Sequence, residues 1–303
     1  SPTLLSLIVR WFPSSSFTQT YPPSDPHPPA ATRPFSLLSN SPPSGDLRHV
    51  SPDSAASPRP PPCHRLLAQD GGATALVLAG AYSLVLAFDS LTKHNLIEQS
   101  LSRKIVHVSS GLLYMSAWPF FSSSAEARYF AAVVPLVNCI RLVIYGFSFF
   151  KDEGLIKSLT REGKPEELLR GPLYYVLVLM FCALVFWRDS PVGILVLAMM
   201  SGGDGFADIV GRRFGSSKLP YNKHKSWMGS ISMFIFGFIS SIGMLYYFSA
   251  FGCINLDWGN AVAMVALVSL VATLVESLPI SDVVDDNISV PLSTMLVAML
   301  AFG

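Results

Sequence analysis

Two carboxylates lie four residues apart in the stretch GDGFADIVGRRFG, residues 203–215. On a helix with 100° per residue, Asp204, Asp208, Gly211 and Gly215 fall within roughly 60° of one another. Carboxylates at this spacing can hold a divalent cation, preferentially magnesium where phosphate oxygens complete its shell. Glycines on the same stripe allow a nucleotide or a neighbouring helix to approach closely. We therefore predict a Mg²⁺ site at the two carboxylates.

Positive side chains follow this stretch. Two arginines end it, and the segment YNKHKS, residues 221–226, precedes the next apolar run, whose free N–H groups would also attract an anion. The residues predicted to bind a nucleotide are Gly211, Arg212, Arg213, Gly215, Lys223, Lys225 and Ser226. The alternative is that the glycines only pack helices and the arginines anchor at the membrane interface. Two adjoining anion sites favour nucleotide binding.

A third cluster is ESLPISDVVDDN, residues 276–287. Glu276 ends one apolar run, whereas Asp285 and Asp286 precede the next. These acids are a candidate second set of metal ligands, or partners for the nearby lysines. A solvated acidic turn is the alternative.

Two polar features lie within or beside apolar sequence. Asn138 and Arg141 share one helical face, where an unpaired charge is costly in a membrane, so we expect them to face the substrate or an acid of the bundle; snorkelling is the alternative. In RKIVH, residues 103–107, His107 is a candidate contact to phosphate or to the acceptor hydroxyl, or an interfacial structural histidine. Asp208, Glu276 and His107 are the three candidates for orienting or deprotonating that hydroxyl, and the sequence does not choose among them.

The composition predicts that membrane helices position these residues. Half of the 303 residues are hydrophobic and only 14% are charged. A membrane helix needs about 20 mostly apolar residues. We therefore predict an all-α fold, a polytopic integral membrane helix bundle with seven or eight transmembrane helices. The candidate segments are 72–89, 105–121, 129–150, 172–187, 190–203, 227–249, 259–278 and 288–303, of which the fourth and fifth could form a tight hairpin or one irregular element.

The positively charged residues of the connecting loops lie almost entirely on one face of the predicted membrane bundle. With eight crossings, the loops at 90–104, 151–171, 204–226 and 279–287 share one face and carry 13 Lys or Arg, whereas the opposite loops carry only Arg128 and Arg188. The positive-inside tendency then places the polar face in the stroma or cytoplasm. The net charge of +1 argues against a nucleic-acid partner.

The first 65 residues differ from the rest. They hold 15 of the 23 prolines, 13 serines, five arginines, no lysine and three acids. So little apolar surface cannot offset the entropy of ordering a core. We predict a disordered plastid transit peptide over 1–65, followed by a membrane-embedded domain over 66–303.

From about residue 102 onward the chain resembles the plant chloroplast phytol kinases of the polyprenol kinase family, which is related to the farnesol and dolichol kinases. The matching stretches are SRKIVHVSSGLL, AEARYFAAVVPLVN, IKSLTREGKPEELLRGPLYYV, GGDGFADIVGRRFGSSKLPYN, KSWMGSISMFIFGF and VESLPISDVVDDNISVPL. The nucleotide signature of the dolichol kinases falls on Asp204, Ala207, Gly211 and Gly215.

The resemblance implies a multi-pass chloroplast membrane enzyme. It would transfer the γ-phosphoryl group of CTP, with Mg²⁺, to the hydroxyl of phytol, and its product would feed the synthesis of tocopherol, vitamin E. Farnesol and geranylgeraniol are the alternative acceptors, because the branches share the nucleotide motif.

Two rival functions are weighed against this one. A CTP-dependent phosphatidate cytidylyltransferase has a similar Asp, Ala, Gly, Gly run, but Met228 stands where its basic stretch has an acid. A small transporter could use Asn138 and Arg141 to line a path, although transport sites usually lie near the midplane between repeats and no internal repeat is found here.

Overall fold

The computed structural model describes residues 63–149, 156, 159–160, 163–279 and 284–303. Within these residues the fold is all-α, with one isolated bridge between Lys218 and Ser226. The α-helices are α2 (Cys63–Lys93), α3 (Gln99–Ser116), α4 (Ala127–Gly146), α6 (Gly171–Val185), α7 (Pro191–Ala198), α8 (Gly205–Phe214), α9 (Trp227–Ala250), α10 (Trp258–Ser277) and α11 (Asp286–Phe302). The short turns are the 3₁₀ helices η1 (Trp118–Phe120) and η2 (Pro165–Leu169) and the π-helix η3 (Met199–Asp204). The predicted transit peptide lies outside the described residues, except that α2 begins at Cys63.

Six helical segments of the described chain are long and apolar enough to cross a membrane. They are His64–Lys93, Ala127–Gly146, Pro165–Val185, Pro191–Phe214, Trp227–Ala250 and Trp258–Ser277. The all-α, multi-helix prediction is confirmed, but six segments meet these criteria rather than seven or eight. Of the two remaining predicted segments, α11 has only 17 residues, and α3 carries Arg103, Lys104 and His107 among its apolar residues.

The segment Pro191–Phe214 lies at the centre of the bundle, and most of its residues are buried. Its apolar part was predicted to end at 203 and to lead into a loop. Instead, η3 links α7 directly to α8, so helical hydrogen bonds continue to satisfy the backbone in the interior. Single π-turns inside helices are frequent at functional sites. Asp204 therefore belongs to a buried helix.

The turn between α6 and α7 is tight, as one of the two sequence alternatives expected. Trp187 occupies it with φ of 47° and is almost fully buried. Its ring lies 5.3 Å from that of Trp118, so the aromatic core covers the turn. The two segments therefore form a hairpin of separate helices.

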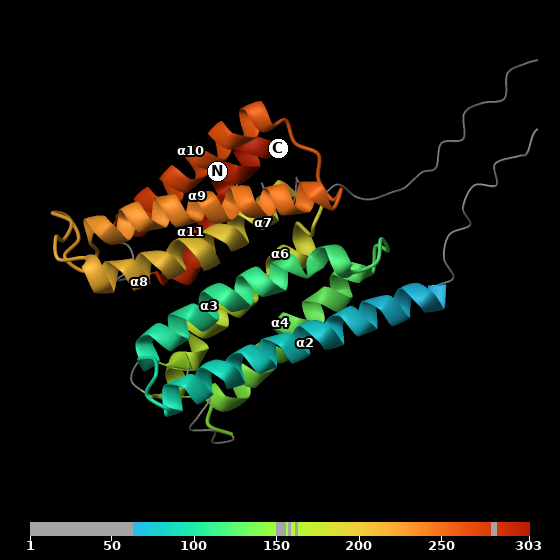
Figure 1. The fold of residues 1–303 in the computed structure, drawn as a ribbon, viewed down its shortest axis with the longest axis horizontal. Coiled ribbons are helices and arrows are strands. Elements are labelled where there is room, and N and C mark those ends of the chain that lie inside the picture. The colour runs from blue at the N-terminus through green and yellow to red at the C-terminus, as the bar shows by residue number, and fades with distance from the viewer. Residues whose placement is uncertain (1–62, 150–155, 157–158, 161–162, 280–283) are drawn as a thin grey trace, which may run out of the picture. The chain divides into compact units, whose positions relative to one another are not determined.

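Close helix contacts fix α3 against the central segment. A Cβ at Gly205 would lie 2.1 Å from Cγ2 of Val108, and one at Gly111 would lie 2.0 Å from Oγ of Ser201. The absence of side chains at both glycines lets the backbones approach. Figure 1 shows α2 beside α3, and α8 beside α9. This packing brings the polar start of α3 to the start of α8.

Candidate active site

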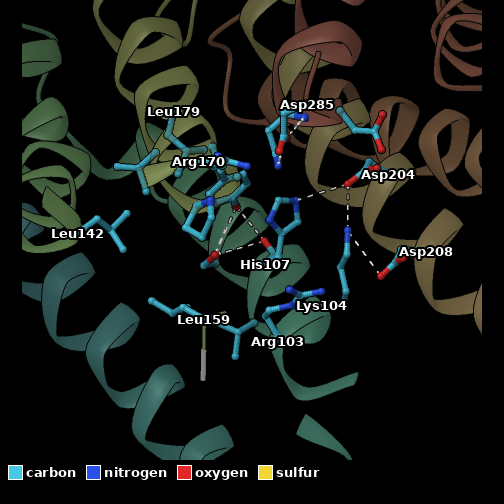
Figure 2. A pocket seen from close by; sticks show the side chains of 18 of the residues that line it. Arg103, Lys104, His107, Leu142, Leu159, Arg170, Leu179, Asp204, Asp208 and Asp285 are labelled. Carbon is cyan, nitrogen blue, oxygen red and sulfur yellow. Dashed lines mark hydrogen bonds and ion pairs between the residues drawn. The ribbon is translucent and has the colours of Figure 1, made fainter. Parts of the chain in front are cut away.

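One cavity of about 1200 Å³ contains most of the predicted site. Figure 2 shows its two sides, with Asp204 and Asp208 on one and Leu142, Leu159 and Leu179 on the other. Most charged residues come from the start of α3, the end of η3, the starts of α8 and α11, the segment before α9 and the end of α10, whereas the apolar side chains come from α2, α4, α6 and the middle of α3. Further charged residues lie on α4 and in or beside η2, namely Arg141, Lys164, Glu166, Glu167 and Arg170. The cavity therefore offers one polar and one apolar half to the same ligand.

Lys104 joins the carboxylate at the end of η3, Asp204, to that of Asp208 in α8. Its Nζ lies 3.3 Å from Oδ2 of Asp204 and 3.7 Å from Oδ2 of Asp208, and Arg212 Nε donates to Oδ1 of Asp208 over 2.8 Å. Figure 2 shows Lys104 between the two acids, with His107 beside Asp204. Lys104, Asp204 and Asp208 form what we call the Lys104 cluster. The i, i+4 spacing does place both acids on one face, as predicted.

A second lysine joins acids from two other helices. Lys225, just before α9, donates to Oε1 of Glu276 at the end of α10 and, over 2.9 Å, to Oδ2 of Asp286 at the start of α11. Lys225, Glu276 and Asp286 form the Lys225 cluster. Burial alone would lower the pKa of Lys225, but the two acids and, more weakly, Asp204 outweigh it and hold this pKa above its usual value. Lys225 therefore stays charged.

His107 is held by the neighbouring helices. Its Nε2 lies 3.3 Å from the carbonyl oxygen of Met200 and 4.0 Å from Oδ2 of Asp204. Tyr175 donates to the carbonyl oxygen of His107 over 2.8 Å, and the two rings lie 4.0 Å apart. His107 therefore lines the cavity in a fixed orientation.

The predicted glycines lie at a helix contact. A Cβ at Gly211 would lie 3.4 Å from Cα of Gly229, and one at Gly215 would lie 2.3 Å from Oγ of Ser226. Ser226 caps α9 by accepting a hydrogen bond from the backbone N–H of Gly229. These contacts agree with the alternative that the glycines pack helices together. Gly211 and Ser226 also line the cavity. Their binding of a nucleotide stays a prediction.

The cavity gathers some predicted residues and leaves others out. Those that line it are His107, Asn138, Arg141, Asp204, Asp208, Gly211, Arg212, Lys225, Ser226, Glu276, Asp285 and Asp286. Arg213, Gly215 and Lys223 do not. Asp285 uses Oδ1 to cap α11 through the N–H of Asn287, which the spacing of a cap residue before an apolar run could have indicated. Arg141 was expected to face the site or to pair with an acid of the bundle; it lines the cavity, and among the described residues no ion pair with an acid is found for it.

The sequence prediction missed Lys104 as a site residue. The sequence did indicate this role, because Lys104 lies three residues before His107 and hence on the same helical face. Arg170, just before α6, also lines the cavity. Nothing in its local sequence indicates this, because Arg170 reaches the site only through the packing of α6.

Three of the four acids in the two clusters have a buried oxygen without a hydrogen-bond partner. Buried oxygens of Asp208 (Oδ2), Glu276 (Oε2) and Asp286 (Oδ1) have no hydrogen-bond partner. Among the described residues, no three His, Cys, Asp or Glu side chains gather closely enough to hold a metal by themselves. Mg²⁺ usually takes one or two carboxylates together with phosphate oxygens and water, rather than an all-protein cage. The residues therefore fit a Mg²⁺ that a nucleotide helps to hold.

The fold and site together define a class: a multi-helix protein with several candidate membrane spans and a cavity that is charged at one side and apolar at the other. No family model and no solved structure matches the chain. Curated relatives do. The chain is 65% identical over 242 residues to "Probable phytol kinase, chloroplastic" of Triticum aestivum, which covers 80% of this chain and 81% of the relative.

Two further relatives agree. "Phytol kinase 1, chloroplastic" of Arabidopsis thaliana is 64% identical over 237 residues, 78% of each chain. "Probable phytol kinase, chloroplastic" of Zea mays is 67% identical over 235 residues, again 78% of each chain. The chain belongs to the phytol kinase family, which confirms the resemblance seen in its sequence, and it is an enzyme. As a kinase it uses a nucleotide phosphoryl donor.

Proposed function

We propose that this protein transfers the γ-phosphoryl group of CTP to the hydroxyl of phytol, giving phytyl phosphate and CDP, in a chloroplast membrane. The observation that carries this proposal is that one cavity has both a charged and an apolar half. A phosphate donor needs the first half and a prenyl alcohol needs the second. Curated relatives named chloroplastic phytol kinases support the acceptor and the compartment. CTP rests on the family resemblance.

We also infer that the chain crosses the membrane eight times, with α3 and α11 added to the six longer segments. Residues from all four loops that the sequence assigns to one face line the same cavity. They include Arg103, Lys164, Lys218 and Asp285. An eight-helix arrangement with this cavity at the polar face accounts for their meeting.

The charged half supplies the parts of a phosphoryl-transfer site. Asp204 and Asp208 would hold Mg²⁺, with Asp285 and Asp286 as a second candidate pair; bound Mg²⁺ would offset charge on the transferred phosphate. Gly211, Arg212, Lys225 and Ser226, which line the cavity, would bind the remaining phosphates, whereas the predicted Arg213, Gly215 and Lys223 lie outside it. Little covalent chemistry is then required of the protein, because positioning and charge stabilisation supply most of the catalysis.

The hydroxyl oxygen of phytol attacks the γ-phosphorus, a P–O bond forms, and the bond to the CDP oxygen breaks. The hydroxyl proton must pass to a base. Of the three candidates we favour Asp208, which lines the cavity and whose Oδ2 accepts no hydrogen bond, since Nζ of Lys104 lies 3.7 Å away from it. Nε2 of His107 faces the carbonyl oxygen of Met200, and Glu276 is tied to Lys225. Asn138 and Arg141, on α4, would contact the acceptor.

The test is a radiolabel assay on the purified protein in detergent micelles. Each nucleotide, labelled at the γ-phosphate, is offered with phytol, geranylgeraniol or farnesol. We expect label in phytyl phosphate, the fastest transfer from CTP, and release of CDP. Release of pyrophosphate instead would support a cytidylyltransferase. Flux of phytol across reconstituted vesicles without any transfer would support a transporter.

A further inference from the structure

We propose that the apolar half of the cavity binds the isoprenoid tail of the acceptor and that Ala81 and Tyr114 set the tail length that is accepted. This inference rests on the proposed function, because it assigns the part of the substrate that does not react. Neither the charged clusters nor the relatives specify where the tail lies.

The outer wall of the apolar half is one face of α2. It comprises Val77, Leu78, Ala81, Tyr82 and Val85, all of which line the cavity. Their spacing of one, three and four residues is that of a single helical stripe. Eight residues of rise correspond to about 12 Å of helix. The wall is thus an extended apolar strip, the shape that an extended hydrocarbon chain can cover.

Helix α3 connects this wall to the reacting end. Lys104, His107, Ser110, Leu113 and Tyr114 line the cavity in order along the helix. The ten residues from Lys104 to Tyr114 correspond to about 15 Å. Polar side chains come first and apolar ones follow. A hydroxyl held near Lys104 therefore directs its tail along α3 toward Tyr114.

Tyr114 forms a rigid end to this path. Its hydroxyl donates to the carbonyl oxygen of Ala131 over 3.1 Å, and only 4% of the residue is exposed. Its ring meets Trp118 edge to face at 5.9 Å, and Trp118 packs in turn on Trp187 at 5.3 Å. A side chain held by a hydrogen bond and by close packing cannot move aside cheaply. Tyr114 therefore limits how far a tail can extend.

Ala81 has the smallest side chain of the α2 wall. The other four wall residues are Val, Leu or Tyr, so the wall recedes at Ala81. Each buried methylene contributes about 0.8 kcal/mol, so the part of the tail that fills this space adds binding energy. A Cβ at the neighbouring Gly80 would lie 3.6 Å from Cδ2 of Leu113, so this recess lies beside the apolar end of the path along α3, and a longer prenol fills more of it than a shorter one. Position 81 should therefore discriminate by length.

The experiment compares Ala81→Phe with the unchanged protein, using phytol, geranylgeraniol and farnesol at saturating nucleotide. The added ring fills the recess, so we expect kcat/KM to fall about tenfold or more for the two longer alcohols and less than about threefold for farnesol. The KM of the nucleotide should not change. Leu76→Phe is the matched control, because Leu76 lies on α2 outside the cavity and is 70% exposed; it should behave like the unchanged protein.

A second measurement does not depend on a variant. A phytol analogue with a diazirine near the tail end, photolysed in the unchanged protein, should label peptides that contain Ala81 or Tyr114. The tail site is overturned if Ala81→Phe lowers kcat/KM equally for all three alcohols. It is also overturned if the diazirine labels only helices other than α2 and α3. Absence of transfer to any alcohol by the unchanged protein overturns the proposed function instead, so the two failures differ.

Discussion

The Lys104 cluster and the Lys225 cluster have the same composition, one lysine between two carboxylates, but different origins. In the first, both acids lie four residues apart on one continuous helical segment, Asp204 at the end of η3 and Asp208 in α8. In the second, three segments contribute one residue each, and 51 residues separate Lys225 from Glu276. Short-range spacing can therefore specify the acid pair of the first cluster, whereas helix packing has to bring Lys104 to that pair and to assemble the whole of the second cluster. Both clusters line the same cavity.

The largest expected effect is on the Lys104 cluster. Asp204→Asn and Asp208→Asn should each lower kcat by about a thousandfold or more, because the carboxylates act on charge that develops during transfer. The radiolabel assay measures this, and the variants should remain in the membrane. Asp257→Asn, at the exposed cap of α10 outside the cavity, should have no effect. Normal turnover in a variant lacking both carboxylates would refute their metal role.

The Lys225 cluster should be more important for stability. Lys225→Met leaves Glu276, whose side chain is 5% exposed, without its partner, which costs about 3 kcal/mol. A thermal melt in detergent micelles measures the loss. Adding Glu276→Gln should restore most of the melting temperature but not activity. If the double variant recovers neither the melting temperature nor the activity, Lys225 stabilises the protein through packing of the aliphatic part of its side chain.

A smaller effect tests how α3 reaches the Lys104 cluster. Gly205→Ala places a methyl group against Val108, so we expect a loss of about 1–3 kcal/mol in stability and reduced turnover as Lys104 is displaced. Val108→Ala in the same chain removes the clashing Cγ2 and should restore both quantities. If the single variant is fully active, close α3–α8 contact is not required.

The smallest expected effect is at the edge of the Lys104 cluster. Arg212→Gln should change stability by no more than about 0.5 kcal/mol, because the side chain is 48% exposed and pairs with Asp208 in solvent. The KM of the nucleotide should rise if Arg212 binds phosphate. If Arg212→Gln lowers the melting temperature as much as Lys225→Met does, the two clusters do not differ in their contribution to stability.

The site could be predicted in part, for reasons that particular residues make clear. The pair Asp204 and Asp208 was visible because both lie within one helical turn. Lys104 was not assigned to it, because contact with α8 depends on the glycine packing at Gly205. The predicted end of the fifth segment at residue 203 was wrong, because hydropathy falls at Asp204 while the helical backbone continues to Phe214. The helical placement of residues 204–215, from which the acid pair was predicted, agrees with the structure through Phe214.

The sequence by itself determined the helical class, the polar faces and the family, because apolar length and local spacing are properties of contiguous residues. Only the tertiary structure decided that Lys225 meets acids of α10 and α11, and that α2, α3, α4 and α6 enclose an apolar space beside the charged residues. Such contacts depend on which helix faces meet, and that is settled by the packing of the whole bundle rather than by any one segment.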